Sequence, residues 1–173
     1  ASFGKGARDG PQAIIKCLNE NVEFFDRFTS TEYTEHYKFA TKALGISNDL
    51  LPEEMVEKVK TEYYQLINKK QFLMLLGGEH SVSIGALQAI SEKFNPNEIT
   101  FFQIDAHCDL RDSNFNACPD QSHISKYAHC CVARRAYEIG FHIVQVGIRS
   151  YAKEEHIFFS QNDKIVVFEW GKG

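Results

Sequence analysis

The sequence lacks several features that would assign it to a broad class of protein. No stretch approaches the ~18 apolar residues that a membrane-spanning helix needs. Positive charge is not in excess, since 19 basic and 23 acidic residues give a net charge of −4, so there is no electrostatic basis for binding nucleic acid. The first residues lack the apolar core and cleavage pattern of a secretory signal. We therefore expect a globular protein with neither a membrane nor a nucleic acid as its partner.

Paired cysteines are also lacking. The five cysteines form no CxxC pair, and an odd count without a framework spacing favours reduced thiols in a cytoplasmic protein over disulfides. The later four are Cys108, Cys118, Cys130 and Cys131, and their spacing argues against a zinc site. The sequence also lacks repeats and low-complexity segments, and its 173 residues fit one domain, 1–173.

Short apolar runs alternate with segments of helical periodicity. The predicted strands are residues 72–76, 99–104, 143–148 and 165–168, and the predicted helices are residues 11–19, 52–68, 82–94 and 127–139. Such alternation is typical of βαβ units whose parallel sheet is covered on both faces. The predicted fold is α/β, with three α/β/α layers and a mainly parallel sheet in which the first three strands are neighbours.

Two polar clusters follow the first two predicted strands. The run at 72–76 ends in GGEHS, residues 77–81, and the run at 99–104 ends in DAHCD, residues 105–109. Ligands of open α/β sheets bind outside the carboxyl ends of the strands. The period-2 spacing of Asp105, His107 and Asp109 directs their side chains to one side of an extended segment, and His80 adds a second imidazole. These residues predict a divalent metal site, which suits manganese better than a soft cation.

Each motif also has a structural interpretation. Asp105 and Asp109 would suit a polar turn, His80 could bond nearby backbone, and Gly77-Gly78 could form a tight turn before a helix. Taken singly, these interpretations are favoured. Taken together, four metal-binding groups at one partly buried sheet edge are too many to leave unpaired, and the metal site is the better hypothesis.

GGEHS followed by DAHCD resembles the first two signature motifs of the ureohydrolase family, which includes arginases and agmatinases. FGKGARDGPQAI resembles the glycine-rich opening segment of that family, while YAHCCVARRAYE and IVQVGIRS resemble segments of its agmatinase branch. The matches run in the family's order from Phe3 to about Glu155 and are weak between Tyr33 and Leu51. The resemblance implies an arginase-like fold.

The resemblance also implies a mechanism and roles for particular residues. Family members use two Mn²⁺ ions to hold a bridging hydroxide, which attacks the guanidinium carbon and releases urea and an amine. His80 and Asp109 would bind one ion, His107 the other, and Asp105 would bridge them. His129 resembles a histidine that assists proton transfer beside the substrate.

Some assignments stay open. His123 is a rival to His129, and Arg149 would contact either substrate or another subunit. The implied partner is a small guanidino substrate, with agmatine as the expected compound. The implied assembly is a cytoplasmic homo-oligomer. Arginase-type and formiminoglutamase-type substrates are the alternatives within the family.

One departure affects the expected activity. The family completes its metal site with a later DxDxxDP-type motif, which does not occur before Gly173. We therefore expect an incomplete fold that lacks its C-terminal part, and no turnover by these residues alone. A non-catalytic relative of the family or an unrelated metal hydrolase would be the alternative functions.

Overall fold

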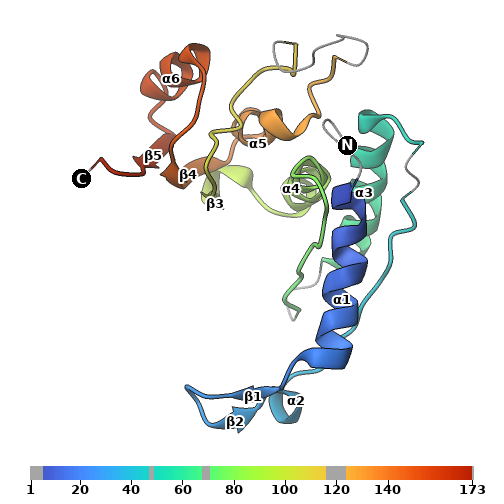
Figure 1. Cartoon of the computed structure of the whole chain (residues 1–173). Helices are drawn as coiled ribbons and strands as arrows, with labels where there is room; N and C mark the ends of the chain where they lie inside the picture. The colour runs from blue at the N-terminus through green and yellow to red at the C-terminus, as the bar shows by residue number, and fades with distance from the viewer. Residues whose placement is uncertain (1–5, 47–48, 68–70, 116–123, 173) are drawn as a thin grey trace.

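The computed structural model describes residues 6–46, 49–67, 71–115 and 124–172. Its centre is a parallel sheet with the strand order β3 (Thr100–Ile104), β4 (His142–Ile148) and β5 (Ile165–Glu169). Helix α5 (Val132–Ile139) joins β3 to β4, and α6 (Lys153–Ser160) joins β4 to β5. Parallel neighbours require such crossover connections. The α/β class is confirmed (Figure 1), and so is the parallel pairing of the strands.

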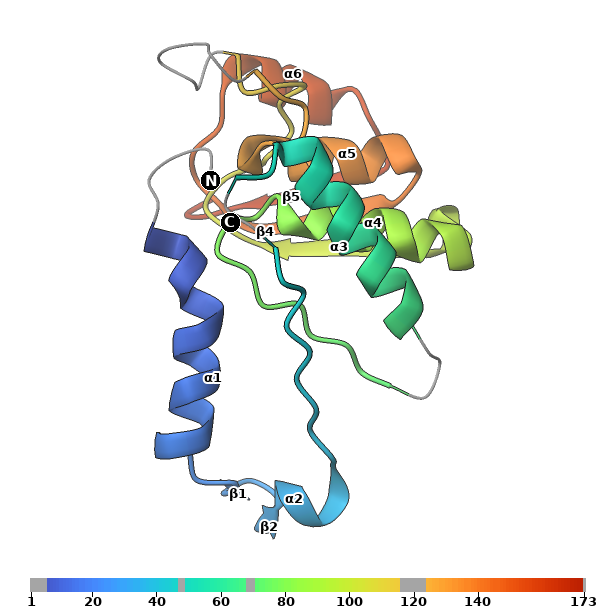
Figure 2. The same cartoon turned by 90° about the vertical axis from the view of Figure 1, so that its right-hand side faces the viewer.

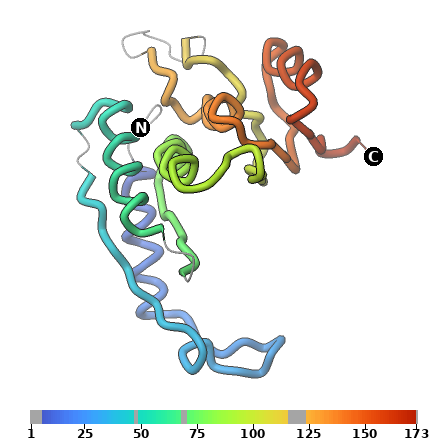
Figure 3. Tube along the Cα trace, turned by 180° about the vertical axis from the view of Figure 1, so that it is seen from behind, coloured from blue at the N-terminus to red at the C-terminus, as the bar shows by residue number. Residues whose placement is uncertain are grey.

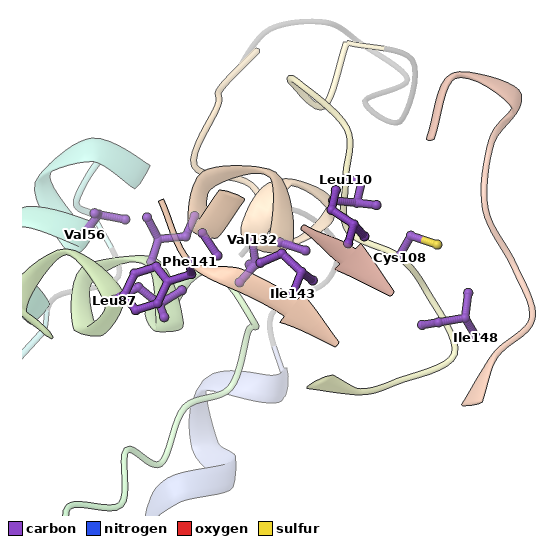
Figure 4. Packing of buried hydrophobic residues seen from close by; sticks show 12 residues of the cluster. Val56, Leu87, Cys108, Leu110, Val132, Phe141, Ile143 and Ile148 are labelled. Carbon is purple, nitrogen blue, oxygen red and sulfur yellow. The ribbon is translucent and has the colours of Figure 1, made fainter. Parts of the chain in front are cut away.

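The core lies between the central strand and the helices of its covered face. Ile143 of β4, Val132 of α5 and Phe141 between them are fully buried, with Leu110 and Cys108 from the loop after β3 (Figure 4). On the opposite face, the strand side chains Phe102 and Ile104 are 59% and 80% exposed. The described residues therefore leave part of the sheet uncovered.

Helices α3 (Pro52–Leu66) and α4 (Val82–Lys93) pack closely together beside α5 (Figure 1). Their contact depends on Gly85, because a Cβ at this position would overlap the carbonyl oxygen of Val56 and the side chain of Val59. Only glycine permits this approach of the two backbones. α4 is thereby fixed against the core, and the turn that precedes it carries His80.

The N-terminal region extends away from this body (Figures 2 and 3). It comprises η1 (Gly6–Asp9), α1 (Gly10–Asn21), the antiparallel pair β1 (Phe25–Asp26) and β2 (Thr31–Glu32), and α2 (Tyr33–His36). No residue of α1 is buried. Among the described residues, none of the helices combines the length and apolar character that crossing a membrane requires.

Most predicted elements are confirmed, with small shifts at their ends. The helix predicted at 127–139 instead begins as a short 3₁₀ turn, η3 (His129–Cys131), before α5 starts. A second short turn, η2 (Pro96–Glu98), precedes β3, and α6 was not predicted.

The strand predicted at 72–76 is wrong, as is its placement beside the strand at 99–104. These residues form no regular ladder in the described structure, and Phe72 and Met74 are 90% and 73% exposed. A strand requires partners for its backbone N–H and C=O groups as well as an apolar sequence. None of the described strands pairs with this segment.

Candidate metal centre

The loop after β3 is fixed from several sides at the carboxyl edge of the sheet. The backbone N–H groups of Arg149 and Ser150 donate to the carbonyl oxygen of Ala106 at 2.9 and 3.0 Å. The N–H of Arg134 donates to the carbonyl oxygen of Asp109 at 3.1 Å. Asp109 has a positive φ of 51°, which few non-glycine residues adopt. The surrounding contacts maintain this strained backbone conformation and the orientation of its carboxylate.

Two buried amides beneath the loop contribute to the same geometry. Gln145 of β4 donates to the side-chain oxygen of Gln103 at 2.6 Å and to the carbonyl oxygen of Cys108. Gln103 in turn donates to the carboxylate of Asp109 at 3.4 Å and to the carbonyl oxygen of His107 at 3.3 Å. A buried amide is costly unless it is hydrogen-bonded, so these contacts favour the observed conformation of the loop, although Oε1 of Gln145 has no partner of its own among the described residues.

Glu155 is a third support that the sequence did not indicate. Its side chain is only 4% exposed, and it accepts from the N–H of Leu110 at 3.0 Å and from the N–H of Ala152 at 2.7 Å. Arg111 lies 3.8 Å from it and provides the opposite charge. Glu155 therefore links the start of α6 to the loop after β3. The signal that could have indicated it is a glutamate three residues after the N-cap of a helix, where such a side chain accepts from the capping backbone N–H.

His80 comes from the turn before α4 and reaches the loop from the other side. Its Nδ1 lies 2.7 Å from Oδ2 of Asp109 and 3.8 Å from Oδ2 of Asp105. The turn passes against η1 at Gly78, where a Cβ would overlap the backbone of Ala7. His80, Asp105 and Asp109 each offer one ligand atom, and these atoms lie within 4.8 Å of one another. The structure thus brings together three of the four predicted ligands.

His107 lies beside these three residues but outside their cluster. Its side chain is 64% exposed, and its Nδ1 lies 3.4 Å from Oδ1 of Asp105. Burial raises the pKa of Asp105, but the His107 backbone N–H, Gln103 and the charges of the imidazoles outweigh it and leave the pKa lowered. Asp105 is therefore an anion near neutral pH and is oriented by its hydrogen bond from the His107 N–H at 2.9 Å.

The other predicted site residue, His129, lies near Glu79. Its Nδ1 is 3.7 Å from Oε1 of Glu79, which directly precedes His80 in the chain. The close carboxylate of Glu79 raises the pKa of His129, burial opposes this, and the charges of Cys130 and Asp109 add to the increase. His129 therefore lies in the electrostatic environment of the cluster. The rival His123 lies outside the described residues, and Arg149 contacts the carbonyl oxygen of Gly147 at 3.3 Å.

The cluster has the chemistry of a site for a divalent cation. One imidazole and two carboxylates offer nitrogen and oxygen donors without a thiolate, a set that suits Mn²⁺ and similar metals. The one thiol within the motif, Cys108, is fully buried, and burial raises its pKa to about 12, so it does not supply a thiolate ligand near neutral pH. The residues therefore fit a hard or borderline metal ion.

Comparison with known proteins gives a consistent family relationship. The Arginase family model matches residues 1–170. The chain is 35% identical over 171 residues to an N(1)-aminopropylagmatine ureohydrolase from Thermococcus kodakarensis, covering 94% of this chain and 51% of that protein. It is 32% identical over 164 residues to an agmatinase from Pyrococcus horikoshii, covering 93% and 52% respectively.

Solved structures give the same fold. A crystal structure from Clostridium difficile, whose assignment as an agmatinase is provisional, matches with a TM-score of 0.80 and 27% identity. The match covers 98% of this chain and 58% of that one. The chain spans about half the length of the curated relatives it matches.

Proposed function

Because this chain belongs to the arginase family, we propose that the whole protein is a manganese-dependent hydrolase of a guanidino compound. The proposed substrate is agmatine or a close analogue, and the products are urea and an amine. The observation that carries the proposal is the convergence of His80, Asp105 and Asp109 on one spot. The similarity to an agmatinase and to an aminopropylagmatine ureohydrolase supports a guanidino substrate that ends in an amine.

The roles of the ligands follow from their positions and from the family resemblance. His80 and Asp109 would hold one cation, since their ligand atoms lie 2.7 Å apart and would turn from each other to the metal. Asp105 lies between His80 and His107 and would bridge to a second cation bound by His107. Two bound Mn²⁺ ions would supply Lewis-acid stabilisation and lower the pKa of water, which a poorly electrophilic guanidinium requires.

His129 is the proposed proton donor to the departing amine. Its contact with Glu79 raises its pKa, so a larger fraction of the imidazole holds a proton near neutral pH than is usual for histidine. Its side chain is 41% exposed, which leaves it accessible to a small molecule. Glu79 orients the His129 imidazole, and His80, the next residue in the chain, binds the cation. The same turn thus serves both proton transfer and metal binding.

The described ligand set is half of a two-metal site. A second bridging carboxylate is needed to offset the repulsion between two close divalent ions, and the sequence holds no DxDxxDP-type motif to provide it. We therefore propose that residues 1–173 alone bind Mn²⁺ weakly and do not release urea. The single-domain organisation, the cytoplasmic location and the homo-oligomeric assembly expected from the resemblance belong to the same proposal.

Urea release provides the test. The full-length protein, its Asp105→Asn variant and the 173-residue chain are assayed with agmatine, arginine and a phosphoester, with and without Mn²⁺. We expect Mn²⁺-dependent urea release from agmatine by the full-length protein only. Absence of urea from every guanidino substrate would instead favour a non-catalytic relative. Phosphoester hydrolysis would favour an unrelated type of metal hydrolase, and urea release by the short chain would show that its site is already complete.

A further inference from the structure

Two adjacent cysteines next to His129 have no role in the proposed reaction. Cys130 and Cys131 lie on the 3₁₀ turn η3, and their sulfur atoms are 3.8 Å apart. With Ala128 they form a small buried cluster of their own, separate from the main core. Cys130 is 8% exposed to solvent, and Cys131 is fully buried. The two thiols therefore share a buried site in which their sulfur atoms are in contact.

The two thiols differ in acidity, because the pKa of Cys130 is lowered and that of Cys131 is raised. The hydrogen bond from the Cys131 thiol lowers the pKa of Cys130 to about 7, burial opposes this, and the charges of His129 and Arg111 contribute to the decrease. The same hydrogen bond, with burial, raises the pKa of Cys131. As pH rises through about 7, Cys130 becomes a thiolate that accepts a hydrogen bond from the Cys131 thiol. Thiolates are the nucleophilic form of cysteine, so attack on an electrophile begins at the more exposed sulfur.

We propose that Cys130 and Cys131 form a dithiol site that binds a soft, thiophilic centre, with trivalent arsenic as its representative. Soft thiolates select soft metals and metalloids, and two sulfurs 3.8 Å apart can bind one such atom together. With an organoarsenic(III) oxide, two As–S bonds form and the bonds between arsenic and oxygen break. The oxygen leaves as water, which takes one proton from the Cys131 thiol and the other from the Cys130 thiol, or from solvent where Cys130 is already a thiolate. Arsenic stays trivalent, so no oxidant or reductant is required.

The other described cysteines do not offer such a site. Cys17 is exposed, and no second thiol contacts it among the described residues. Cys108 is fully buried, and burial raises its pKa to about 12, which leaves it protonated. Only Cys130 and Cys131 have their sulfurs in contact in the described part of the chain. Among the described cysteines, binding of arsenic by two sulfurs together is therefore expected only at this pair, and an experiment can distinguish it from binding by a single thiol.

Phenylarsine oxide is the probe, and the native 173-residue chain is the target. We expect a one-to-one adduct by intact mass spectrometry, reversed by dithiothreitol but not by 2-mercaptoethanol at an equal thiol concentration. Digestion of the wild-type adduct should place arsenic on the peptide that contains both cysteines. This measurement needs no variant, so it does not depend on how well a substituted chain folds.

Single substitutions provide the second arm. Cys130→Ser and Cys131→Ser should each weaken binding about 10²-fold, since the second sulfur then no longer adds its effective concentration. Cys17→Ser is the matched control and should bind like the wild type. The proposal is overturned by arsenic on any other peptide, by reversal with the monothiol, or by full affinity in either serine variant whose circular dichroism matches that of the wild type.

Discussion

The two segments that deliver the proposed metal ligands differ sharply in how they are supported. The loop 105–110 after β3 is hydrogen-bonded to the segment after β4, to α5 and to α6. Residues 71–77, which lead to His80, have an apolar sequence but no ladder partner among the described strands, and Phe72 is 90% exposed. The first segment is therefore preorganised within this chain, whereas the second is fixed mainly at its end, where Gly78 packs on η1 and His80 contacts Asp109.

This difference shows which ligand-bearing segment is held by contacts within the described residues and which is not. The carboxylates of Asp105 and Asp109 have fixed orientations before any cation binds. His80 joins the two segments, and its contact with Asp109 closes the cluster. Substitutions in the loop should therefore affect binding and stability strongly, and substitutions in residues 71–77 should affect them weakly.

Removing the Asp109 carboxylate should have the largest effect. Asp109→Ala deletes a ligand atom, the 2.7 Å contact with His80 and the acceptor of Gln103, so Mn²⁺ affinity should fall by at least about 10²-fold. Isothermal titration of the 173-residue chain with MnCl₂ measures the change. Asp112→Ala is the matched control, because this aspartate pairs with Arg135 outside the cluster. Equal losses in the two variants would mean that general charge, and not the cluster, binds Mn²⁺.

Among the polar side chains that support the loop, Glu155 should show the largest effect on folding. Glu155→Ala leaves the N–H groups of Leu110 and Ala152 without their acceptor, and the first of these bonds is buried. The free energy of unfolding should fall by about 2–3 kcal/mol. Urea denaturation measures it, with the exposed neighbour in Glu154→Ala as the control and an expected change within about 0.5 kcal/mol. Similar values for the two variants would show that Glu155 does not secure the loop.

Sequence patterns identified the elements whose formation depends on local periodicity. The helices α3 and α4 and the strands β3, β4 and β5 were predicted within a few residues. The segment 72–76 failed because an apolar run specifies burial but does not provide a partner strand. Helix α6 was missed because its eight residues, KEEHIFFS, have a weak helical pattern, and it is held by tertiary contacts such as that of Glu155 with Leu110 and the packing of Phe158 on the core.

The sequence predicted the three residues of the cluster, including the distant His80, but not the residues that support them. The period-2 spacing of Asp105, His107 and Asp109 identified the loop, although the exposed His107 lies outside the cluster that the other two form with His80. Gln145 is 42 residues from its partner Gln103, and Glu155 is 45 residues from Leu110. Such supports are invisible without the fold, because a polar residue on a strand or helix is usually exposed.

A smaller effect is expected from the titration of His129. Its folded pKa is raised above the ordinary 6.5, so its contact with Glu79 stabilises the fold fully below the unfolded pKa. This contribution is lost as pH rises through the folded pKa. The side chain is 41% exposed, so solvent screening limits the effect to below about 1 kcal/mol. NMR titration of the His129 ring should give a lower pKa in Glu79→Gln, and an unchanged pKa would exclude Glu79 as the cause.

The smallest effect on stability should come from residues 71–77, which have an apolar sequence but lie outside the core. Phe72→Ser changes a side chain that is 90% exposed, so little apolar surface returns to water on unfolding, and stability should change by less than about 0.5 kcal/mol. Phe141→Ala is the matched comparison, since Phe141 is fully buried and its loss should cost about 3–5 kcal/mol. Urea denaturation of both variants in the 173-residue chain separates them. A loss above about 1 kcal/mol for Phe72→Ser would mean that residues 71–77 are packed in solution. The two ligand-bearing segments would then be equally supported, and the contrast between them would no longer hold.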